Sequence, residues 1–264
     1  MYYLSVITVA YNNKDGLIRT RDSILPLPDN CEWIIIDAAS SDGTKEEILE
    51  ALPKQDNIRW ISEPDKGIFD GMNKGIDLAK GKYLNFMNSG DFYNRSAFIE
   101  VANSEPDDAD IMVYDYLPLS ESLESAPARS FVKQIEKIRE YDCIPHQSTL
   151  ISKKTFNKIG YYDLSYSCAA DYAFFANAYI SNIVFKFDDN IELSYFVQDG
   201  ISSGLRLSLT IGLENMKIQK KYFKNYSLKL FFVYMSKFLI SFVPKNKNIY
   251  SFLRNNLLPK KPKV

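Results

Sequence analysis

The sequence lacks the short motifs that mark several common enzyme classes. No G-x-G-x-x-G stretch follows the first predicted strand, and no G-x-x-x-x-G-K-[ST] stretch occurs at all. This argues against a dinucleotide-dependent dehydrogenase and a P-loop NTPase. His146 is the only histidine, and no serine or cysteine has a matching base. Zinc chemistry and acyl-enzyme catalysis therefore have no support.

Cysteine is also scarce. Cys31, Cys143 and Cys168 are widely spaced and odd in number, and they form no C-x-x-C pair. This is not a disulfide framework, so we expect a reducing compartment. The first residues run directly into a strand pattern, with no basic segment and no cleavable signal, which agrees with that expectation.

Acidic residues are nearly absent from residues 205–264. This part has thirteen lysines and arginines and a single acid, Glu214, for a net charge of +12. The preceding residues carry nineteen basic and thirty-two acidic residues, for a net charge of −13. Such asymmetry predicts a basic tail with an anionic partner. Because the rest of the chain is acidic, we expect no nucleic-acid partner.

The apolar pattern predicts alternating strands and helices in the first half. With 264 residues, 46% of them hydrophobic, the chain can build one large α/β domain or a domain with an appendage. Strands are expected at residues 4–10, 33–36, 58–61, 83–87 and 111–114, and helices at 14–25, 44–52 and 68–79. This alternation predicts a mostly parallel sheet covered by helices on both faces.

The second half is less regular. Helices are expected at residues 153–159 and 171–180, a loop at 117–128, and a hairpin of strands 183–187 and 191–196. The hairpin would turn at residues 188–190. The acids Asp188 and Asp189 resemble a metal pair there, but an exposed turn explains them equally well.

Polar side chains follow four of the predicted strands where each strand ends. They are Tyr11 and Asn12, then Asp37, then Glu63 and Asp65, then Asp91. Since the carboxyl ends of parallel strands meet at one edge of a sheet, we expect a binding cleft there rather than four unrelated helix caps. An acidic cleft that holds a diphosphate needs a divalent cation. Mg²⁺ or Mn²⁺ suits oxygen ligands, and Asp91 is the natural candidate.

Residues 226–243 are almost wholly apolar and aromatic, and four lysines precede them between 216 and 224. A membrane-spanning helix needs about twenty apolar residues with few charges, and this segment falls short of that. Basic flanks and aromatic residues instead predict a helix that lies in the membrane interface. A core helix or a dimer interface is the alternative.

Four ordered motifs resemble those of family 2 glycosyltransferases. They are SVITVAYN at 5–12, WIIIDAASSDGT at 33–44, SEPDKGIFDGMNKGI at 62–76 and GKYLNFMNSGD at 81–91. The resemblance covers residues 4–195, and within the family the chain looks most like bacterial enzymes of capsule, exopolysaccharide and colanic-acid-type synthesis. It implies the GT-A fold, a nucleotide-sugar donor, a divalent metal and inversion at the anomeric carbon.

The resemblance also implies roles for individual residues. Those that match donor-binding positions are Ala10, Tyr11, Asn12, Asp37, Asp65, Lys66, Asp70, Asn73, Asn88, Ser89 and Gly90. Asp91 matches the last acid of the family's Asp-x-Asp-type metal motif, but residues 88–91 hold only this one carboxylate, which puts strict metal dependence in question. His146 and Gln147 match a His-Gln pair near the active site, for a contact with donor or acceptor. A hydrogen-bonded structural histidine is the alternative.

Asp171 matches the acid that serves as the catalytic base in this family. Chemistry agrees with that role, because inversion in one step needs a carboxylate that accepts the proton of the attacking hydroxyl. The start of a helix also favours a negative charge. The alternative is a plain helix N-cap.

These observations predict a membrane-associated, inverting glycosyltransferase that moves a sugar from a UDP-sugar to a lipid-linked saccharide at the cytoplasmic face of the bacterial inner membrane. Residues 1–204 would form the GT-A domain, with a nucleotide-binding half at 1–115 and an acceptor half at 116–204, and 205–264 the membrane-associated helical region. Two alternatives stay open. One is a sugar-phosphate nucleotidyltransferase, whose glycine-rich loop residues 10–14 lack. The other is a non-catalytic sugar-nucleotide or membrane-binding module.

Overall fold

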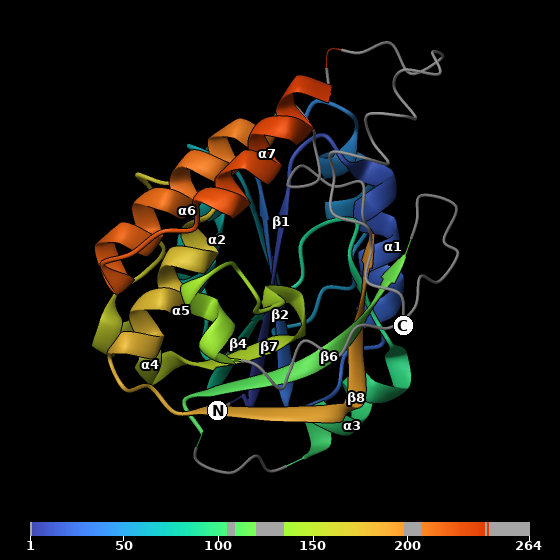
Figure 1. The fold of residues 1–264 in the computed structure, drawn as a ribbon. Coiled ribbons are helices and arrows are strands. Elements are labelled where there is room, and N and C mark those ends of the chain that lie inside the picture. Colours follow the sequence, from blue (N-terminus) through green and yellow to red (C-terminus); the bar gives the residue numbers. More distant parts are fainter. Residues whose placement is uncertain (1, 105–108, 120–134, 198–206, 241, 243–264) are drawn as a thin grey trace.

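A mixed sheet of eight strands forms the centre of the protein (Figure 1). The computed structural model describes residues 2–104, 109–119, 135–197, 207–240 and 242. The strands are β1 Leu4–Ala10, β2 Cys31–Asp37, β3 Ile58–Ser62, β4 Tyr83–Phe86, β5 Phe92–Tyr93, β6 Ile111–Leu119, β7 Thr149–Ser152 and β8 Phe185–Val197. Their order across the sheet is β3-β2-β1-β4-β7-β6-β8-β5.

Helices cover both faces of this sheet. They are α1 Lys14–Ile24, the π-type turn η1 Thr44–Leu49, α2 Ile68–Leu78, α3 Arg95–Asn103, the 3₁₀ turns η2 Ile135–Arg139 and η3 His146–Ser148, α4 Lys153–Ile159, α5 Ala170–Ile180, α6 Ser208–Phe223 and α7 Leu228–Ile240. Neighbouring residues of β1 point to opposite faces, as in any strand. Val6 packs in the core beneath α1, η1 and α3, whereas Ile7 packs in the core beneath α2, α4 and α5.

The first half of the chain folds as the sequence predicts. Strand β1 has the predicted bounds, and α1, α2, β3 and β4 start as predicted and end within one residue of the prediction. Strand β2 starts two residues earlier and ends one residue later than predicted. Strands β3, β2, β1 and β4 are parallel, with Ala10 opposite Asp37 and Asp37 opposite Ser62. The predicted carboxyl-end edge is therefore confirmed for these strands.

Beyond β4 the sheet is mixed, with antiparallel strands beside the parallel pair of β6 and β8. Strand β7 lies between β4 and β6 and is antiparallel to both, and β5 is antiparallel to β8. The sequence pattern does not predict β5 or β7, because two and four residues are too few to show a period. Both strands are defined instead by the partners that pair with them.

The predicted hairpin at residues 183–196 is wrong. Strand β8 is one long strand that runs parallel to β6 on both sides of residues 188–190. The register shifts there, because Asp188 lies opposite Tyr114 whereas Glu192 lies opposite Asp115. The Asn190 N–H donates to the Asp188 carboxylate over 3.0 Å, so the turn-forming residues make a bulge at which β8 bends (Figure 1).

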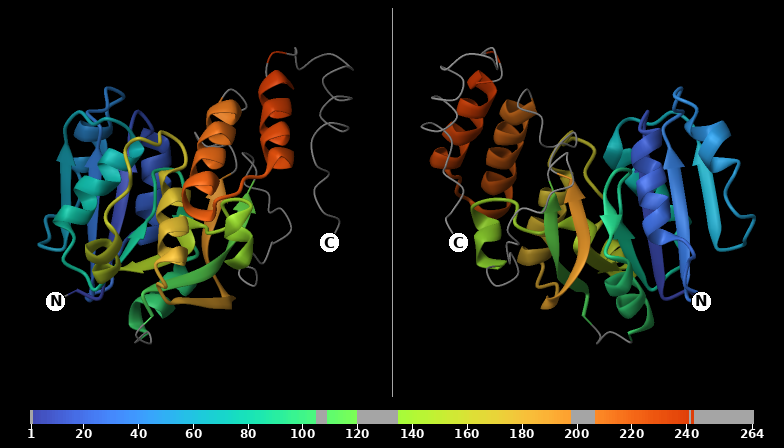
Figure 2. Two further views of the ribbon diagram at one scale, coloured as in Figure 1. Left: turned by 60° about the vertical axis from the view of Figure 1, so that its left-hand side comes forward. Right: turned by 90° about the vertical axis from the view of Figure 1, so that its right-hand side faces the viewer.

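Helices α6 and α7 form a hairpin at one side of the molecule, with α6 between α7 and α5 (Figure 2). Gly212 allows a close approach, since a Cβ atom there would lie 2.8 Å from Cβ of Tyr234 on α7. Ile218 of α6 is fully buried in the core beneath α2, α4 and α5, so α6 packs as part of the same domain as the sheet. Among the described helices, none combines the length and the hydropathy that a membrane span requires. The boundary predicted between 204 and 205 lies outside the described residues, as do residues 120–128 of the predicted loop.

Candidate active site

The loops that follow β1, β2 and β4 are tied together by side-chain hydrogen bonds. The Asn12 N–H donates to Ser40 Oγ (2.8 Å), and the Ser41 N–H donates to Asn12 Oδ1 (2.8 Å). Asn13 caps α1 by accepting from the Gly16 N–H, and its Nδ2 donates to the Ser89 carbonyl over 2.9 Å. The polar residues at the three strand ends therefore form one continuous edge.

Asp37 is fully buried at this edge. Its carboxylate accepts hydrogen bonds from Ser62 Oγ (2.6 Å) and from the Ser40 N–H (3.1 Å). In this structure it therefore holds the loops after β2 and β3 in place, and the predicted contact with a nucleotide stays a prediction. Tyr11 differs, because 63% of its surface is exposed, whereas the preceding Ala10, which lies opposite Asp37, is buried.

The other predicted donor-binding residues between β3 and α2 contact one another and the backbone. Asp65 accepts from the Gly67 N–H (2.8 Å), and Asp70 accepts from the N–H of the exposed Lys66 (3.0 Å). Both ends of the Asn73 amide bond the backbone of Tyr162, at 2.9 and 3.1 Å. These side chains shape the segment and join α2 to the chain before α5, while their contacts with a donor stay predictions.

The loop at residues 88–91 is held by α1. The Gly90 N–H donates to Thr20 Oγ1 (3.0 Å), which in turn donates to the Asp91 carbonyl (2.7 Å). Gly90 has a φ of +108°, a backbone conformation that glycine adopts without strain. Asp91 is half-buried. Among the described residues, no group of three His, Cys, Asp or Glu side chains could hold a metal, and Asp91 is the one carboxylate of residues 88–91.

His146 joins this loop to α5. Its Nε2 lies 3.1 Å from Asn88 Nδ2, and its Nδ1 lies 3.3 Å from Asp171 Oδ2. An Asn88 amide that donates through Nδ2 requires an unprotonated Nε2, which places the ring proton on Nδ1, where Asp171 accepts it. Asn88 Oδ1 is buried and has no hydrogen-bond partner among the described residues. Side chains from three separate parts of the chain thus meet in one row.

Carboxylates surround His146 and change how it titrates. Burial alone would lower the pKa of His146, but the hydrogen bond and charge of Asp171, with the charges of Asp91 and Asp142, outweigh this and raise it. The protein atoms around the Asp142 carboxyl shield it from water and raise its pKa, even though part of the side chain is exposed. The negative charge of Asp171 raises this pKa further. Gln147 is buried next to the histidine in the chain, and its main-chain carbonyl accepts a hydrogen bond from Asn85 Nδ2 (3.1 Å).

Asp171 is the second residue of α5, where its side chain is 14% exposed. The N-cap position belongs to Ala169, so the alternative of a plain N-cap is wrong for Asp171. Its Oδ1 accepts from the Tyr172 N–H (2.9 Å), which leaves Oδ2 toward His146. Asp171 is therefore a partly accessible carboxylate beside the Asn88–His146 pair, in the first turn of a helix.

Glu214, which no sequence motif includes, contacts the chain just before α5. The carboxylate of this α6 residue is 7% exposed and accepts hydrogen bonds from backbone N–H groups of residues 167–169. The available signal was its isolation, since Glu214 is the single acid among the thirteen basic residues of the tail. A lone acid in a basic segment indicates a partner elsewhere in the fold.

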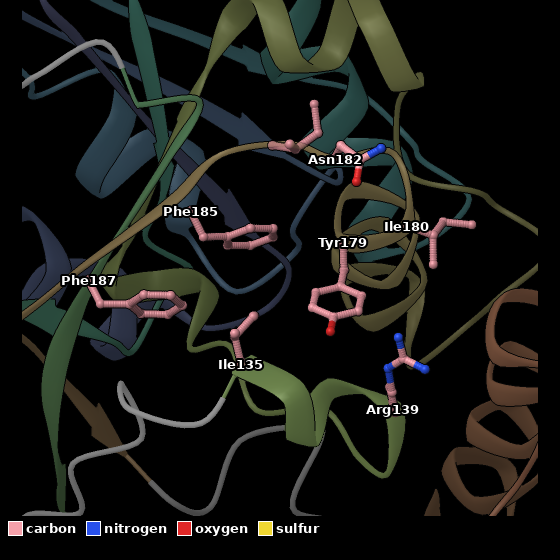
Figure 3. A pocket seen from close by; sticks show the side chains of 8 residues that line it. Ile135, Arg139, Tyr179, Ile180, Asn182, Phe185 and Phe187 are labelled. Atoms are coloured by element: carbon pink, nitrogen blue, oxygen red, sulfur yellow. The ribbon is translucent and has the colours of Figure 1, made fainter.

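A pocket of about 720 Å³ lies away from this site, at the other end of α5 (Figure 3). Tyr179, Phe185 and Phe187 give it an aromatic lining, and the Arg139 guanidinium lies 5.4 Å from the centre of the Tyr179 ring. Asp171 and Tyr179 are eight residues apart on α5, or about 12 Å along the helix axis. None of the predicted site residues lines this pocket.

Comparison with known families identifies the chain. Residues 5–149 match the family described as Glycosyl transferase family 2. The chain is a family 2 glycosyltransferase. It is 31% identical over 193 residues to an uncharacterized glycosyltransferase of Mycobacterium tuberculosis, a match of 66% of this chain and 68% of the relative. It is 28% identical over 148 residues to a PGL/p-HBAD biosynthesis glycosyltransferase of Mycobacterium bovis, which spans 54% of this chain and 56% of that relative.

Solved structures of other glycosyltransferases share the fold of this one. S. aureus TarS in complex with UDP-GlcNAc has a TM-score of 0.59 at 17% identity, over 96% of this chain and 74% of TarS. The mannosyltransferase PcManGT from Pyrobaculum calidifontis, in complex with GDP-Man and Mn²⁺, has a TM-score of 0.64 at 14% identity, over 85% and 66% of the two chains. At these identities the likeness shows the fold alone, which is the GT-A fold that the sequence motifs implied.

Proposed function

We propose that this glycosyltransferase moves a sugar from a UDP-sugar to a hydroxyl group of a lipid-linked saccharide, with inversion at the anomeric carbon. The observation that supports this most is the row Asn88–His146–Asp171, which brings a partly accessible carboxylate next to the loop that ends in Asp91. The wider assignment to bacterial capsule, exopolysaccharide or colanic-acid-type synthesis is part of the proposal and rests on the sequence motifs.

Asp171 acts as the base in this mechanism. Its Oδ2 accepts the proton of the acceptor hydroxyl while the hydroxyl oxygen attacks the anomeric carbon and the bond to the nucleoside diphosphate breaks. His146 fixes the orientation of Asp171 through its Nδ1–H, and Asn88 fixes the ring through Nε2.

Asp91 fits a divalent cation of the kind that accompanies nucleotide diphosphates. Mg²⁺ and Mn²⁺ commonly take one or two carboxylates from the protein and complete their coordination with substrate phosphates and water. A single half-buried carboxylate, on a loop that Thr20 holds in place, meets that need. A bound Mn²⁺ or Mg²⁺ supplies Lewis-acid stabilisation of the departing diphosphate.

The donor is tested by calorimetric titration of UDP and then GDP, each with Mn²⁺ and with EDTA. We expect UDP to bind more tightly in Mn²⁺, because the cation offsets the repulsion between the diphosphate and Asp91. Tighter binding of GDP would correct the nucleotide and leave the reaction as proposed. If folded protein binds neither nucleotide, the donor proposal fails and the non-catalytic alternative gains support.

The exposed face of α7 supports an acceptor at a membrane. Leu228, Phe232 and Leu239 are 53%, 59% and 58% exposed, and their spacing places them on one side of the helix. Exposed lysines, Lys220, Lys221 and Lys224, stand at the end of α6, a few residues before α7 begins. An apolar helix face beside basic residues suits an anionic membrane surface. We propose that α7 lies on the cytoplasmic face of the bacterial inner membrane.

The membrane contact is tested by replacing Phe232 and Leu239 with serine in the full chain. Deletion of residues 205–264 is a poorer test, because it would also remove Ile218 from the core. Burial of one such apolar side chain contributes at least about 1.5 kcal/mol, so the double variant should bind anionic vesicles about 100-fold more weakly. The measurement is flotation with phosphatidylglycerol vesicles.

Two exposed apolar residues outside α6 and α7 provide the matched control. Ile99 on α3 and Val184 before β8 are 40% and 58% exposed, and their replacement with serine should leave flotation unchanged. If the α7 double variant floats as well as wild type, α7 is not the membrane contact.

A further inference from the structure

Glu214 accepts four hydrogen bonds from the chain that leads into α5. The N–H and Oγ of Ser167 each donate to Oε1 over 2.8 Å. The N–H groups of Cys168 and Ala169 donate to Oε2 over 2.9 and 3.0 Å. Three successive backbone N–H groups thus point at one carboxylate, a concave arrangement that favours negative charge. Glu214 is 7% exposed, so water competes little for these bonds.

These bonds fix the chain directly before Asp171. Helix α5 has no side-chain hydrogen bond at its own N-cap, Ala169, so its entry is not fixed by a capping residue. Glu214 holds that same residue and the two before it, from a helix more than forty residues further along the chain. The position of Asp171, two residues after Ala169, therefore depends on α6.

The same helix also holds the chain that leads to His146. Gln219 of α6 is 1% exposed, and its Nε2 donates to the carbonyl of Glu140, six residues before the histidine. Its Oε1 accepts from the Ser227 N–H over 2.8 Å, so the Gln219 amide is fixed at both ends. Helix α6 thus contacts both segments whose side chains meet in the Asp171–His146 pair.

We propose that Glu214 is a positioning residue that sets the contact between Asp171 and His146. The effect of Glu214 on turnover rests on the proposed function of Asp171 as the base, whereas its effect on the contact between Asp171 and His146 does not. Glu214 contacts no reacting group itself and acts through the backbone of residues 167–169. It also gives a reason for an acid in a tail that otherwise carries only basic charge.

The geometric effect is measured on His146, whose signal is unique because it is the only histidine in the chain. Protein without a histidine tag is titrated by NMR, as wild type, Glu214→Gln and Glu214→Asp. The carboxylates that act on the His146 ring are Asp171, Asp91 and Asp142. If Glu214 sets the contact, both variants shift the His146 titration downward, because a displaced Asp171 no longer stabilises the protonated ring.

The two variants separate geometry from charge. Glu214→Asp keeps the negative charge but is one methylene too short to reach all four donors, whereas Glu214→Gln keeps the length and removes the charge. Lys217→Ala, at an exposed position of α6, is the control and should leave the titration unchanged. A shift in Glu214→Gln alone would reduce the role of Glu214 to its charge, and no shift in either folded variant would overturn the proposal.

Turnover gives a second readout, measured as UDP released from the UDP-sugar that binds most tightly. Both variants should lower kcat by about 10- to 100-fold, the cost of misplacing a reacting group by about 1 Å, with UDP affinity unchanged. In an Asp171→Asn background, Glu214→Gln should cause no further loss, since both act through one carboxylate. An additive loss would overturn the positioning role, whereas full activity of Asp171→Asn itself would overturn only the proposed base.

Discussion

Asp171→Asn is expected to lower turnover by about 10²- to 10⁴-fold and to leave UDP affinity close to that of wild type. Asparagine has the same shape, and its carbonyl oxygen can still accept the Tyr172 N–H at the start of α5. It cannot accept a proton from the acceptor hydroxyl. Turnover is measured as UDP release and affinity by calorimetry, so that the chemical step and donor binding are observed separately.

A surface carboxylate provides the matched control for this substitution. Asp22 on α1 has a side chain that is 61% exposed and pairs with Arg21, away from the row of site residues. Asp22→Asn should therefore keep wild-type turnover and UDP affinity. Turnover that is unchanged in Asp171→Asn would remove Asp171 from the mechanism, and a parallel loss of UDP affinity would indicate a role in donor binding instead.

The same variant has an expected effect on stability with a defined dependence on pH. Because folding raises the pKa of His146, its pair with Asp171 stabilises the folded state fully below the unfolded-state value of about 6.5. That contribution is lost as the pH rises through the folded-state pKa of His146. The difference in Tm between wild type and Asp171→Asn should therefore be larger at about pH 5 than at about pH 9.

The parts of the fold that the sequence predicted are those with a clear local pattern. Strand β1 is a run of seven buried residues, so its bounds follow from composition alone. Strand β8 shows the limit of this approach. Residues 188–190 have the composition of a hairpin turn, but pairing with β6 on both sides keeps β8 a single strand. Tertiary pairing decided between two structures that the local sequence permits equally.

The candidate site shows a similar division. Asn88, His146 and Asp171 were each singled out by motif, but their contact depends on three elements that meet only in the fold. Two expectations about individual side chains also needed the structure. Asp37 is turned inward onto serine hydroxyls, and Asn73 bonds the Tyr162 backbone. Polar residues at a strand end can serve the ligand or the loops that surround it, and their spacing alone does not distinguish the two.

Glu214 lies outside the region that the motifs cover. The resemblance ends at residue 195, and the tail was interpreted from its charge and its apolar segment as a membrane contact. Helix α6 instead buries Glu214, Ile218 and Gln219 against the α5 side of the molecule. The exposed apolar face belongs to α7. Packing thus divides the tail into a helix that is buried against α5 and a helix with an exposed apolar face, which we propose meets a membrane.

Asp91→Ala is expected to abolish the dependence of UDP binding on Mn²⁺. Loss of residues that merely support a metal ligand commonly costs about 10- to 100-fold in metal affinity, so loss of the loop's single carboxylate should cost at least as much. The loop itself should stay in place, because Thr20 bonds the backbone of residues 90 and 91 and not the Asp91 side chain. Calorimetry of UDP in Mn²⁺ and in EDTA gives both quantities for one protein sample.

The comparison of the two conditions decides what Asp91 does. If it holds the cation, UDP affinity in Mn²⁺ falls to the value in EDTA, and the EDTA value matches that of wild type. Asp91→Asn, which keeps one oxygen ligand without the charge, should lie between the two. If Asp91→Ala retains the full effect of Mn²⁺, the cation is held by the diphosphate and by other groups. In that case residues 88–91 do not bind a metal through Asp91, and donor binding depends on the edge formed by residues 12, 13, 40 and 41.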